Sequence, residues 1–543
     1  MFLPKKKKML VTCALPYANG SIHLGHLLEQ IQADIWVKYN RMCGHEVYFI
    51  CADDAHGTPV MLKAKQLNIN PEKLINKIYN EHVLDLKQFN IDYDNYHTTN
   101  SIENFFFVKL IFNHLKKKNF IKKKIIKQLY DDTYNLFLPD RFIKGTCPNC
   151  KSINQYGDHC ENCGTTYSSV HLINPISILS KKKPILCNSE HYFFDLPQFN
   201  NFLQKWINSN VLDHIIKNKI QEWFFLGLKQ WDITRDGPYF GFKIPKTINK
   251  YFYVWLDAPI GYISTFKNLC DKYSKLNFYQ WWEKKTNTEL YHFIGKDIIY
   301  FHCLFWPAIL EGMNFRKPTK LFVHGHVTLN GYKMSKSRGN FITARKWLEF
   351  IDSDSLRYYY ASKLSSNIND IDLNINDFTF KINGDIVNKI VNLASRNAYF
   401  INNYFNDNLS NINIILYLKF IKKSEIIHNY FFKRQYSHVI KQIIILSNIA
   451  NSYIDKHKPW LLIKDNLKKK KVHNICSMGI NMFRVIMIYL KPIMPILSKK
   501  TELFLKHKLS FHNIKNPLIN QKINKFKPLF SRINIKNIKN IIT

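Results

Sequence analysis

Apolar residues near the start of the chain alternate between short strand-like runs and a longer helical pattern. Residues 10–14 and 46–51 are short apolar runs that predict buried strands. Between them, apolar residues recur at helical spacing over 22–42. This alternation, which continues to about residue 117, is typical of a parallel α/β sheet.

The strand pattern is interrupted and resumes much later. Residues 118–230 hold a cysteine-rich stretch and a mixed aromatic segment. Strand-like runs return at 251–256, 291–294 and 321–327, and we expect them to complete the sheet. A ligand crevice is then expected at the carboxyl ends of these strands.

Beyond residue 388 the apolar spacing is helical. One face is formed by Tyr436, Val439, Ile440, Ile443, Leu446, Ala450 and Tyr453. A second apolar helix is expected at 475–490, ended by Pro492 and Pro495. The segment 513–543 is rich in Lys, Asn and Ile, and is either an ordered tail against the body or a loose basic extension.

Four of the eleven cysteines form a C-x2-C-x9-C-x2-C pattern: Cys147, Cys150, Cys160 and Cys163. Two such thiolate hooks match a closed tetrahedral zinc site with no position open for catalysis, so we expect one structural zinc ion in a compact knuckle. A disulfide-stapled loop is the alternative. The other seven cysteines lie in apolar surroundings and are expected to be packing thiols.

A motif with phosphate-binding chemistry, PYANGSIHLGH, occupies residues 16–26 directly after the first predicted strand. Its turn places His23 and His26 around the first turn of a helix, where free N–H groups and the dipole favour phosphate. Gly25 has no side chain, so a base or ribose could approach the backbone closely. Two surface histidines at a helix end are the simpler alternative.

A second motif, KMSKS at residues 333–337, lies in a loop after the run 321–327. Lys336 and Lys333, with Ser335 and Ser337 beside them, would supply charge to a departing pyrophosphate. Alone, the motif is an ordinary basic loop. With the histidine motif, it predicts the two walls of one ATP site.

These observations predict an α/β fold, with a Rossmann-type parallel sheet interrupted by a zinc-knuckle insertion and followed by an all-α helical bundle. The expected parts are 1–117, the first half of a nucleotide-binding catalytic domain; 118–230, a connective insertion with the zinc knuckle; 231–327, the second catalytic half; 328–388, a linking segment with the lysine loop; 389–512, a helical domain; and 513–543, a basic C-terminal tail.

The chain is strongly basic, with 78 Lys and Arg against 40 Asp and Glu, formally +38. Such a charge suits a polyanion such as RNA, although part of it reflects a composition saturated in Lys, Asn and Ile. No uncharged apolar run is long enough to predict a membrane span. The first residues lack the apolar core of a signal peptide, so we expect a cytoplasmic protein.

Together and in this order, the two motifs resemble the paired nucleotide signatures of class I aminoacyl-tRNA synthetases. The resemblance is closest to methionyl-tRNA synthetases of the bacterial four-cysteine type and runs from about residue 10 to at least residue 505. It includes the blocks CADDAHG at 51–57, YVWLDAPIGY at 253–262 and FIGKD at 293–297. It implies that methionine and Mg-ATP form methionyl-adenylate, and that the methionyl group then passes to the 3′ end of tRNA(Met), including the initiator.

The resemblance also implies site residues. Those of the methionine site are Leu15, Tyr17, Asp54, Arg235, Trp255, Ala258, Pro259, Tyr262, Ile298 and His302. Those of the ATP site are Asn19, Gly25, Gly295, Asp297, Ser335 and Lys336, with His23, His26, Lys336 and Lys333 in catalysis. Asp54 would hold the ammonium group, and Arg235 would lie near the carboxylate and α-phosphate. From the residues alone, Trp255 and Tyr262 could be core packing, and Asp54 a helix cap or metal ligand.

In the helical domain, Asn392 and Arg396 are one turn apart on a helix face, and Trp460 matches the family's base-stacking position. The resemblance implies that all three bind the anticodon; alone, Trp460 would be a core tryptophan. Many family members continue into a further, dimerising domain, for which this sequence has no room, so we expect a monomer.

Two other functions compete with this interpretation. The first is a class I synthetase for another amino acid. Synthetases for branched aliphatic amino acids carry an editing insertion larger than residues 118–230, and a synthetase for cysteine would have a zinc site with one open ligand position, unlike the four-cysteine site expected here. A zinc-containing RNA-binding or scaffold protein would explain the charge and cysteines, but not two phosphate motifs flanking one sheet.

Overall fold

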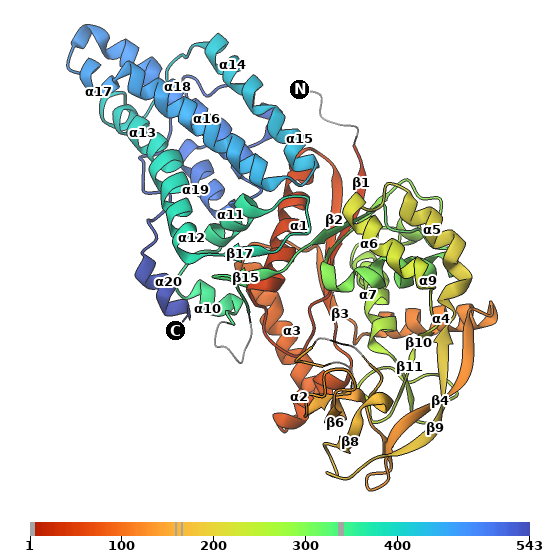
Figure 1. Ribbon diagram of the computed structural model, residues 1–543. Helices are drawn as coiled ribbons and strands as arrows, with labels where there is room; N and C mark the ends of the chain where they lie inside the picture. The colour runs from red at the N-terminus through yellow and green to blue at the C-terminus, as the bar shows by residue number, and fades with distance from the viewer. Residues whose placement is uncertain (1–5, 158–159, 164, 166, 335–340, 543) are drawn as a thin grey trace.

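A five-stranded parallel sheet forms the centre of the computed structural model, which describes residues 6–157, 160–163, 165, 167–334 and 341–542 (Figure 1). The strand order is β14-β13-β1-β2-β3, and every neighbouring pair is parallel. The strands are β1 (Lys8–Cys13), β2 (Glu46–Asp53), β3 (Asn95–Thr98), β13 (Glu289–Gly295) and β14 (Lys320–His324). The predicted parallel sheet is therefore confirmed.

Helices cover both faces of this sheet because the residues of β1 alternate between two apolar cores. Val11 belongs to the core that includes Leu27 and Ile31 of α1, whereas Leu10 belongs to the core that includes Ile260 of α7. The helices of this part are α1 (Leu24–Met42), α2 (Thr58–Gln66), α3 (Pro71–Gln88), α4 (Ile102–Lys117), α7 (Val254–Lys272), α8 (Tyr279–Trp282) and α9 (Trp306–Gly312).

The expectation that residues 251–256 form a strand of this sheet is wrong. Only β12 (Lys250–Phe252) is extended, and it pairs with β11 (Thr234–Asp236) in a separate antiparallel ribbon. The apolar run then continues into α7, which buries Val254, Leu256 and Ile260. A continuous apolar run is compatible with a buried helix as well as a strand, so its periodicity could not separate the two.

Besides the β11–β12 ribbon, the described residues between α4 and α7 form two further small sheets. One has the order β10-β9-β4-β5 and the other the order β7-β6-β8. The elements are β4 (Ile121–Asp131), β5 (Leu136–Phe137), β6 (Ile143–Thr146), β7 (Gln155–Tyr156), β8 (Ile173–Ser177), β9 (Ile185–Phe194), α5 (Asn200–Asn208), α6 (His214–Phe225) and β10 (Trp231–Asp232). In Figure 1, β4 and β9 extend away from the central sheet.

After β14 the chain forms short strands and helices, here called the linking region, and then the predicted helical bundle. The linking elements are β15 (Val327–Leu329), β16 (Tyr332–Lys333), α10 (Ala344–Leu348), α11 (Ser353–Lys363), β17 (Ile371–Leu373) and α12 (Ile375–Lys381), followed by a π-helical segment Ile382–Val391. The later helices are α13 (Asn392–Tyr404), α14 (Ile414–Ser424), α15 (Ile426–Phe432), α16 (Tyr436–His457), α17 (Pro459–Leu462), α18 (Lys469–Leu490), α19 (Pro495–Leu505) and α20 (Ile535–Ile542).

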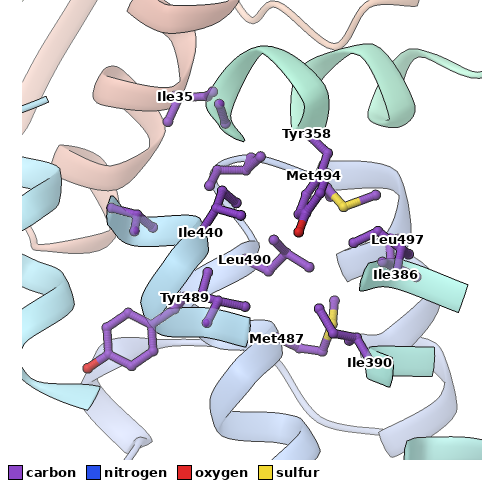
Figure 2. Packing of buried hydrophobic residues seen from close by; sticks show 14 of the residues in the cluster. Ile35, Tyr358, Ile386, Ile390, Ile440, Met487, Tyr489, Leu490, Met494 and Leu497 are labelled. Atoms are coloured by element: carbon purple, nitrogen blue, oxygen red, sulfur yellow. The ribbon is translucent and has the colours of Figure 1, made fainter. Parts of the chain in front are cut away.

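One apolar core joins the bundle to the sheet. Figure 2 shows Ile35 of α1 near Tyr358 of α11, with Ile440 of α16 and Leu490 of α18 facing the same space. These four side chains are at most 3% exposed. Burial of this kind favours a fixed arrangement, since each fully buried large side chain contributes about 1.5–3 kcal/mol.

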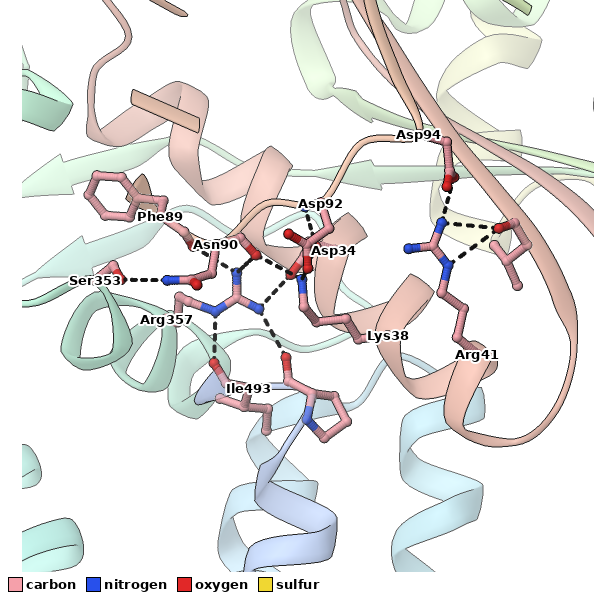
Figure 3. Close-up of polar contacts among 12 residues, drawn as sticks. Asp34, Lys38, Arg41, Phe89, Asn90, Asp92, Asp94, Ser353, Arg357 and Ile493 are labelled. Atoms are coloured by element: carbon pink, nitrogen blue, oxygen red, sulfur yellow. Dashed lines mark hydrogen bonds and ion pairs between the residues drawn. The ribbon is translucent and has the colours of Figure 1, made fainter. Parts of the chain in front are cut away.

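A buried guanidinium crosses the same junction (Figure 3). Arg357 of α11 donates to Asp34 Oδ2 of α1 at 2.6 Å and to the carbonyl oxygens of Ile493 and Pro492 at 2.8 and 2.9 Å. Lys38 Nζ lies 2.5 Å from the other Asp34 oxygen. α1 is thereby bonded to the linking region and to the turn before α19.

The basic tail is ordered against the body. The Asn481 side chain of α18 bonds the backbone N–H and C=O of Leu518 at 2.7 and 2.9 Å. Farther along, Ile538 and Ile541 of α20 are buried and line a small apolar cavity with Leu329 and Ile342. The loose-extension alternative is therefore wrong for the described tail residues. Among the described helices, none is long and apolar enough to cross a bilayer.

Candidate active site

Two adjoining cavities open at the carboxyl ends of β1 and β13, where the strand order reverses. This is where ligands bind in open α/β sheets. The larger, of about 420 Å³, is lined by Ala14, Leu15, Pro16, Tyr17, His23, Gly25, His26, Glu29, Gln30, Gly295, Asp297, Ile298, His324, Gly325, His326, Val327, Met334 and Phe341. The smaller, of about 100 Å³, is lined by Ala14, Leu15, Asp54, Trp255, Ala258, Pro259, Tyr262, Ile298, Phe301, His302 and Trp306. We call them the cleft and the pocket.

The amino terminus of α1 forms one wall of the cleft, as the histidine motif predicted. His23 is the N-cap residue, and its Nδ1 accepts a hydrogen bond from the N–H of Gly25 at 3.0 Å. The rings of His23 and His26 lie 3.8 Å apart between centroids. Burial and the neighbouring His23 hold the pKa of His26 well below its usual value, so His26 is neutral near pH 7. A Cβ at Gly25 would lie 2.8 Å from the His23 ring, so any other residue here would displace that ring.

Some of the other residues expected to bind ATP line the cleft, and others do not. Gly295 and Asp297 line the cleft, and His326 Nε2 lies 2.7 Å from Asp297 Oδ2. Asn19 lies in the turn before α1 and is not a lining residue. The lysine motif begins at Lys333, the last residue of β16. Ser335 and Lys336 lie outside the described residues, as does the side chain of Lys333.

Asp54 gives the pocket its single acidic group. It follows β2, and its Oδ1 is buried with no hydrogen-bond partner among the described residues. Burial, with the nearby charges of Asp257 and Asp53, raises its pKa well above the usual value. A buried carboxylate without a partner is costly, so this pocket favours a cationic ligand group.

Tyr262 and His302 form the inner end of the pocket. His302 Nδ1 lies 3.1 Å from the Ile298 carbonyl, which can only accept, so Nδ1 carries the proton. Nε2 therefore accepts the hydrogen bond from the Tyr262 hydroxyl at 2.9 Å. Burial lowers the pKa of His302 to about 4, consistent with a neutral ring. His302 lies in a π-helical turn, Phe301–Phe305, whose Phe301 also lines the pocket.

Aromatic rings connect the mouth of the pocket to Arg235. Trp255 is 38% exposed, and its ring contacts Phe301 edge-on at 3.6 Å between centroids. Tyr253 stacks beside Trp255 on one side, and the Arg235 guanidinium lies over the Tyr253 ring with Cζ 3.6 Å from its centroid. Arg235 itself lines neither cavity. Tyr17 lines the cleft and donates its hydroxyl to the His56 carbonyl at 2.7 Å.

Known proteins match this chain along most of its length. Residues 9–398 match the family model described as tRNA synthetases class I (M). Methionine–tRNA ligases of Buchnera aphidicola subsp. Acyrthosiphon pisum strains Tuc7 and 5A are each 59% identical over 534 residues, covering 98% of both chains.

The chain belongs to the methionine–tRNA ligases, a family of class I aminoacyl-tRNA synthetases.

The fold agrees with that of known ligases of the family. A methionyl-tRNA synthetase of Mycobacterium tuberculosis, solved with methionyl-adenylate, superposes with a TM-score of 0.80 at 20% identity, covering 97% of this chain and 100% of that one. A second structure of that enzyme gives a TM-score of 0.79. At this identity the comparison bears on the fold alone.

The four cysteines of this ligase come together as predicted and could hold a metal ion. Their sulfur atoms all lie within 4.8 Å of one another. The Cys147–Cys163 and Cys150–Cys160 pairs are 3.8 and 3.5 Å apart. Tetrahedral zinc with Zn–S bonds of about 2.3 Å requires sulfur separations of about 3.8 Å, which these match. None of the four lines the cleft or the pocket, so the arrangement fits a structural ion.

The three residues predicted for the anticodon lie on one side of the bundle. Asn392 and Arg396 are on α13, and the Arg396 guanidinium lies 5.1 Å from the centroid of the Trp460 ring of α17. Trp460 is 38% exposed, so it is not a core tryptophan. Arg396 also pairs with Asp455 at 2.6 Å.

Sequence reasoning missed several cleft residues. Glu29 of α1 is buried, accepts from the N–H of Ala14 at 2.6 Å, and lies 3.0 Å from His324 Nε2. Burial raises its pKa. A signal was present, because Glu29 lies three residues after His26 and therefore on the same face of the helix. His324 and His326 could have been found as polar residues at the end of a predicted strand.

Proposed function

We propose that this ligase activates methionine with ATP to methionyl-adenylate and transfers the methionyl group to the 3′ end of tRNA(Met), including the initiator. The observation that carries the proposal is the lone carboxylate of Asp54 in an otherwise largely apolar pocket that shares Ala14, Leu15 and Ile298 with the cleft. An amino acid with its ammonium on Asp54 and an apolar side chain in the pocket would direct its carboxylate toward the cleft.

Methionine suits the walls of this pocket. A flexible thioether is well held by aromatic and small apolar groups that contact sulfur. The proposed methionine residues are Leu15, Tyr17, Asp54, Arg235, Trp255, Ala258, Pro259, Tyr262, Ile298 and His302. Because His302 is neutral and its Nε2 is occupied by Tyr262, the inner end offers no charge to a polar competitor.

In the first step, a methionine carboxylate oxygen would attack the α-phosphorus of ATP, and the bond to the bridging oxygen of pyrophosphate would break. No protein nucleophile is needed, so the chain acts by positioning and by stabilising charge. Mg²⁺ bound with ATP would neutralise phosphate charge. His23 and His26 would donate to the phosphates, Lys336 and Lys333 would act on the pyrophosphate, and Asn19, Gly25, Gly295, Asp297 and Ser335 would hold the nucleotide.

In the second step, a ribose hydroxyl of the terminal tRNA adenosine attacks the acyl carbon and releases AMP. Asn392, Arg396 and Trp460 are proposed to bind unstacked anticodon bases, for which an exposed ring beside a guanidinium is suited.

We also propose that the knuckle metal is one structural zinc ion, that the six-part division of the chain holds, and that the protein is a cytoplasmic monomer. Light scattering in solution tests whether the protein is a monomer.

The deciding experiment is ATP–pyrophosphate exchange on the purified chain with each of the twenty amino acids and no tRNA. We expect exchange with methionine alone. Exchange with another amino acid would overturn the pocket assignment, and no exchange with any of them would overturn the tRNA-independent activation step.

A further inference from the structure

A buried charged cluster in the insertion lies directly behind Arg235 and outside both cavities. His191 of β9 is fully buried, and its two ring nitrogens face two carboxylates. Nδ1 lies 2.8 Å from Asp232 Oδ2, and Nε2 lies 2.9 Å from Asp236 Oδ2. Carboxylates only accept, so both nitrogens donate and the ring is an imidazolium. Although burial lowers the pKa of His191, these two hydrogen bonds raise it overall.

The two carboxylates flank Arg235 in the chain. Asp236 is satisfied independently of His191, since Lys250 Nζ lies 2.5 Å from Oδ1 and Ser189 donates to Oδ2 at 2.8 Å. Asp232 has fewer partners: Oδ1 accepts from the N–H of Thr234 at 2.9 Å, and Oδ2 accepts from His191.

Among the described residues, Asp232 is the carboxylate that lies within ion-pair distance of Arg235. Nη1 of Arg235 lies 3.6 Å from Asp232 Oδ2, the oxygen that His191 binds, and donates instead to the Thr234 carbonyl at 2.6 Å. The guanidinium is 27% exposed and rests on the Tyr253 ring. An oxygen already bonded by an imidazolium is a weaker competitor for a second cation.

We infer that His191 is a positioning residue for Arg235: by binding Asp232 Oδ2, it keeps that carboxylate from capturing the guanidinium that the substrate anions need. The inference rests on the proposed role of Arg235. It assigns a part in amino acid activation to the β9 strand of the insertion, which contributes no residue to the cleft or the pocket.

The test compares pyrophosphate exchange in five variants, one of them Arg235→Gln, with the wild-type protein, using methionine and ATP. His191→Asn should lower kcat/KM for methionine about tenfold to a hundredfold, because Asp232 then closes on Arg235. Asp232→Asn should stay within about threefold of wild type, because the competitor is gone. The double variant should return to within about threefold of Asp232→Asn. Glu190→Gln, which alters the neighbouring surface pair with Lys123, is the matched control.

A merely structural His191 would make the double variant as weak as His191→Asn, and that result would overturn the inference. If His191→Asn does not fold, Asp232→Asn still tests the inference. A loss of activity in Asp232→Asn as large as that in Arg235→Gln would contradict a competing role for Asp232. Arg235→Gln distinguishes the proposed function from the inference. Full activity in Arg235→Gln would refute the proposed role of Arg235. Loss of activity in Arg235→Gln together with wild-type activity in His191→Asn would refute only the inference.

Discussion

Asp53 and Asp54 are adjacent in the chain, yet their carboxylates lie in different environments. Asp53 Oδ1 is 2.7 Å from His82 Nδ1 and also accepts from the Tyr96 hydroxyl, on the side of α3 and β3. Asp54 lines the pocket and has a buried oxygen without a partner. Asp53 is thus paired inside the protein through Oδ1, although its Oδ2 is also buried without a partner, whereas Asp54 is the aspartate that faces the pocket.

Asp54→Asn is expected to weaken methionine activation and to stabilise the free protein. Removing the charged partner of a buried ammonium costs about 2–5 kcal/mol, so kcat/KM for methionine should fall at least thirtyfold. The raised pKa of Asp54 means that the native state holds its proton more tightly than the unfolded state. Stability is then lost as pH rises from the unfolded pKa through the higher folded value.

The Tm of Asp54→Asn should therefore exceed that of wild type at pH 7, and the difference should vanish below about pH 4. Asp53→Asn is the matched control, because Asp53 is paired and should destabilise on replacement. Equal Tm values for Asp54→Asn and wild type at pH 7 would contradict a destabilising charge on Asp54.

Tyr262→Phe should leave the buried Nε2 of His302 without a donor. The cost of such an orphaned group is about 1–3 kcal/mol, which should appear as a lower Tm and as a KM for methionine raised several-fold. Tyr291→Phe is the control. It removes a hydroxyl that bonds Glu289 at the amino end of β13, and it should leave the KM for methionine unchanged. An unaltered Tyr262→Phe enzyme would mean that the hydroxyl does not orient His302.

His302 also predicts an acid limit. Its folded pKa of about 4 lies below the unfolded value near 6.5, so its contribution to stability is complete above pH 6.5 and is lost as pH falls through 4. Thermal unfolding measured from pH 7 to pH 4 should show this fall. Replacing His302 with Gln should flatten it, and an unchanged slope would argue against a buried neutral ring.

Trp460→Ala should reduce tRNA charging by at least tenfold while exchange stays within about twofold. The expected loss follows from base–aromatic stacking, which contributes about 1–3 kcal/mol per base. Leu461→Ala, at the next and more exposed position, is the control. A collapse of exchange in Trp460→Ala would instead indicate a folding role for the ring.

Cys163→Ser should abolish stoichiometric zinc, measured by elemental analysis, and expose the knuckle to protease. Exchange at low temperature should fall less than tenfold, because the knuckle lies outside both cavities. Cys187→Ser, outside the knuckle, should keep one zinc ion per chain. Exchange lost in proportion to zinc would show that the metal acts in catalysis.

Asp34→Asn should destabilise the junction between sheet and bundle. Although burial raises the pKa of Asp34, the charges of Lys38 and Arg357 lower it overall, and Arg357 keeps its charge in the variant. Breaking one side of a buried pair costs about 3–5 kcal/mol, visible as a lower urea midpoint. Asp94→Asn, in a more exposed pair with Arg41, should shift the midpoint far less, and equal shifts would contradict this account.

Apolar runs predicted strands that are buried on both faces of the sheet, and helical periodicity predicted the helix that buries one face. The runs at 10–14, 46–51 and 291–294, and the face that includes Tyr436 and Val439, all became the expected strands or helix. The run at 251–256 could not be decided, since tertiary packing chose a hairpin followed by a helix. Whether the tail is ordered depended on partners such as Asn481, which lie far away in sequence.

The candidate site was predictable where a residue stands at the end of a predicted element, as His23 does at the N-cap of α1 and Gly295 at the end of β13. It was not predictable from the residues where a turn sets the direction of a side chain. β2 ends at Asp53, so the alternation of a strand does not extend to Asp54. Arg235 was beyond reach for another reason: its surroundings are built by β9 and β10 of the insertion.

Because β1 lies at the centre of the sheet, its two neighbouring strands are synthesised at very different times. β1 pairs with β2 on one side and with β13 on the other, and Thr12 meets His292 across a separation of 280 residues. At about 5–20 residues per second, roughly 15 to 60 seconds of translation separate the two strands. During that interval one edge of an apolar strand stays without its partner, and such edges invite aggregation. The nascent chain is therefore expected to depend on chaperones until β13 has left the ribosome.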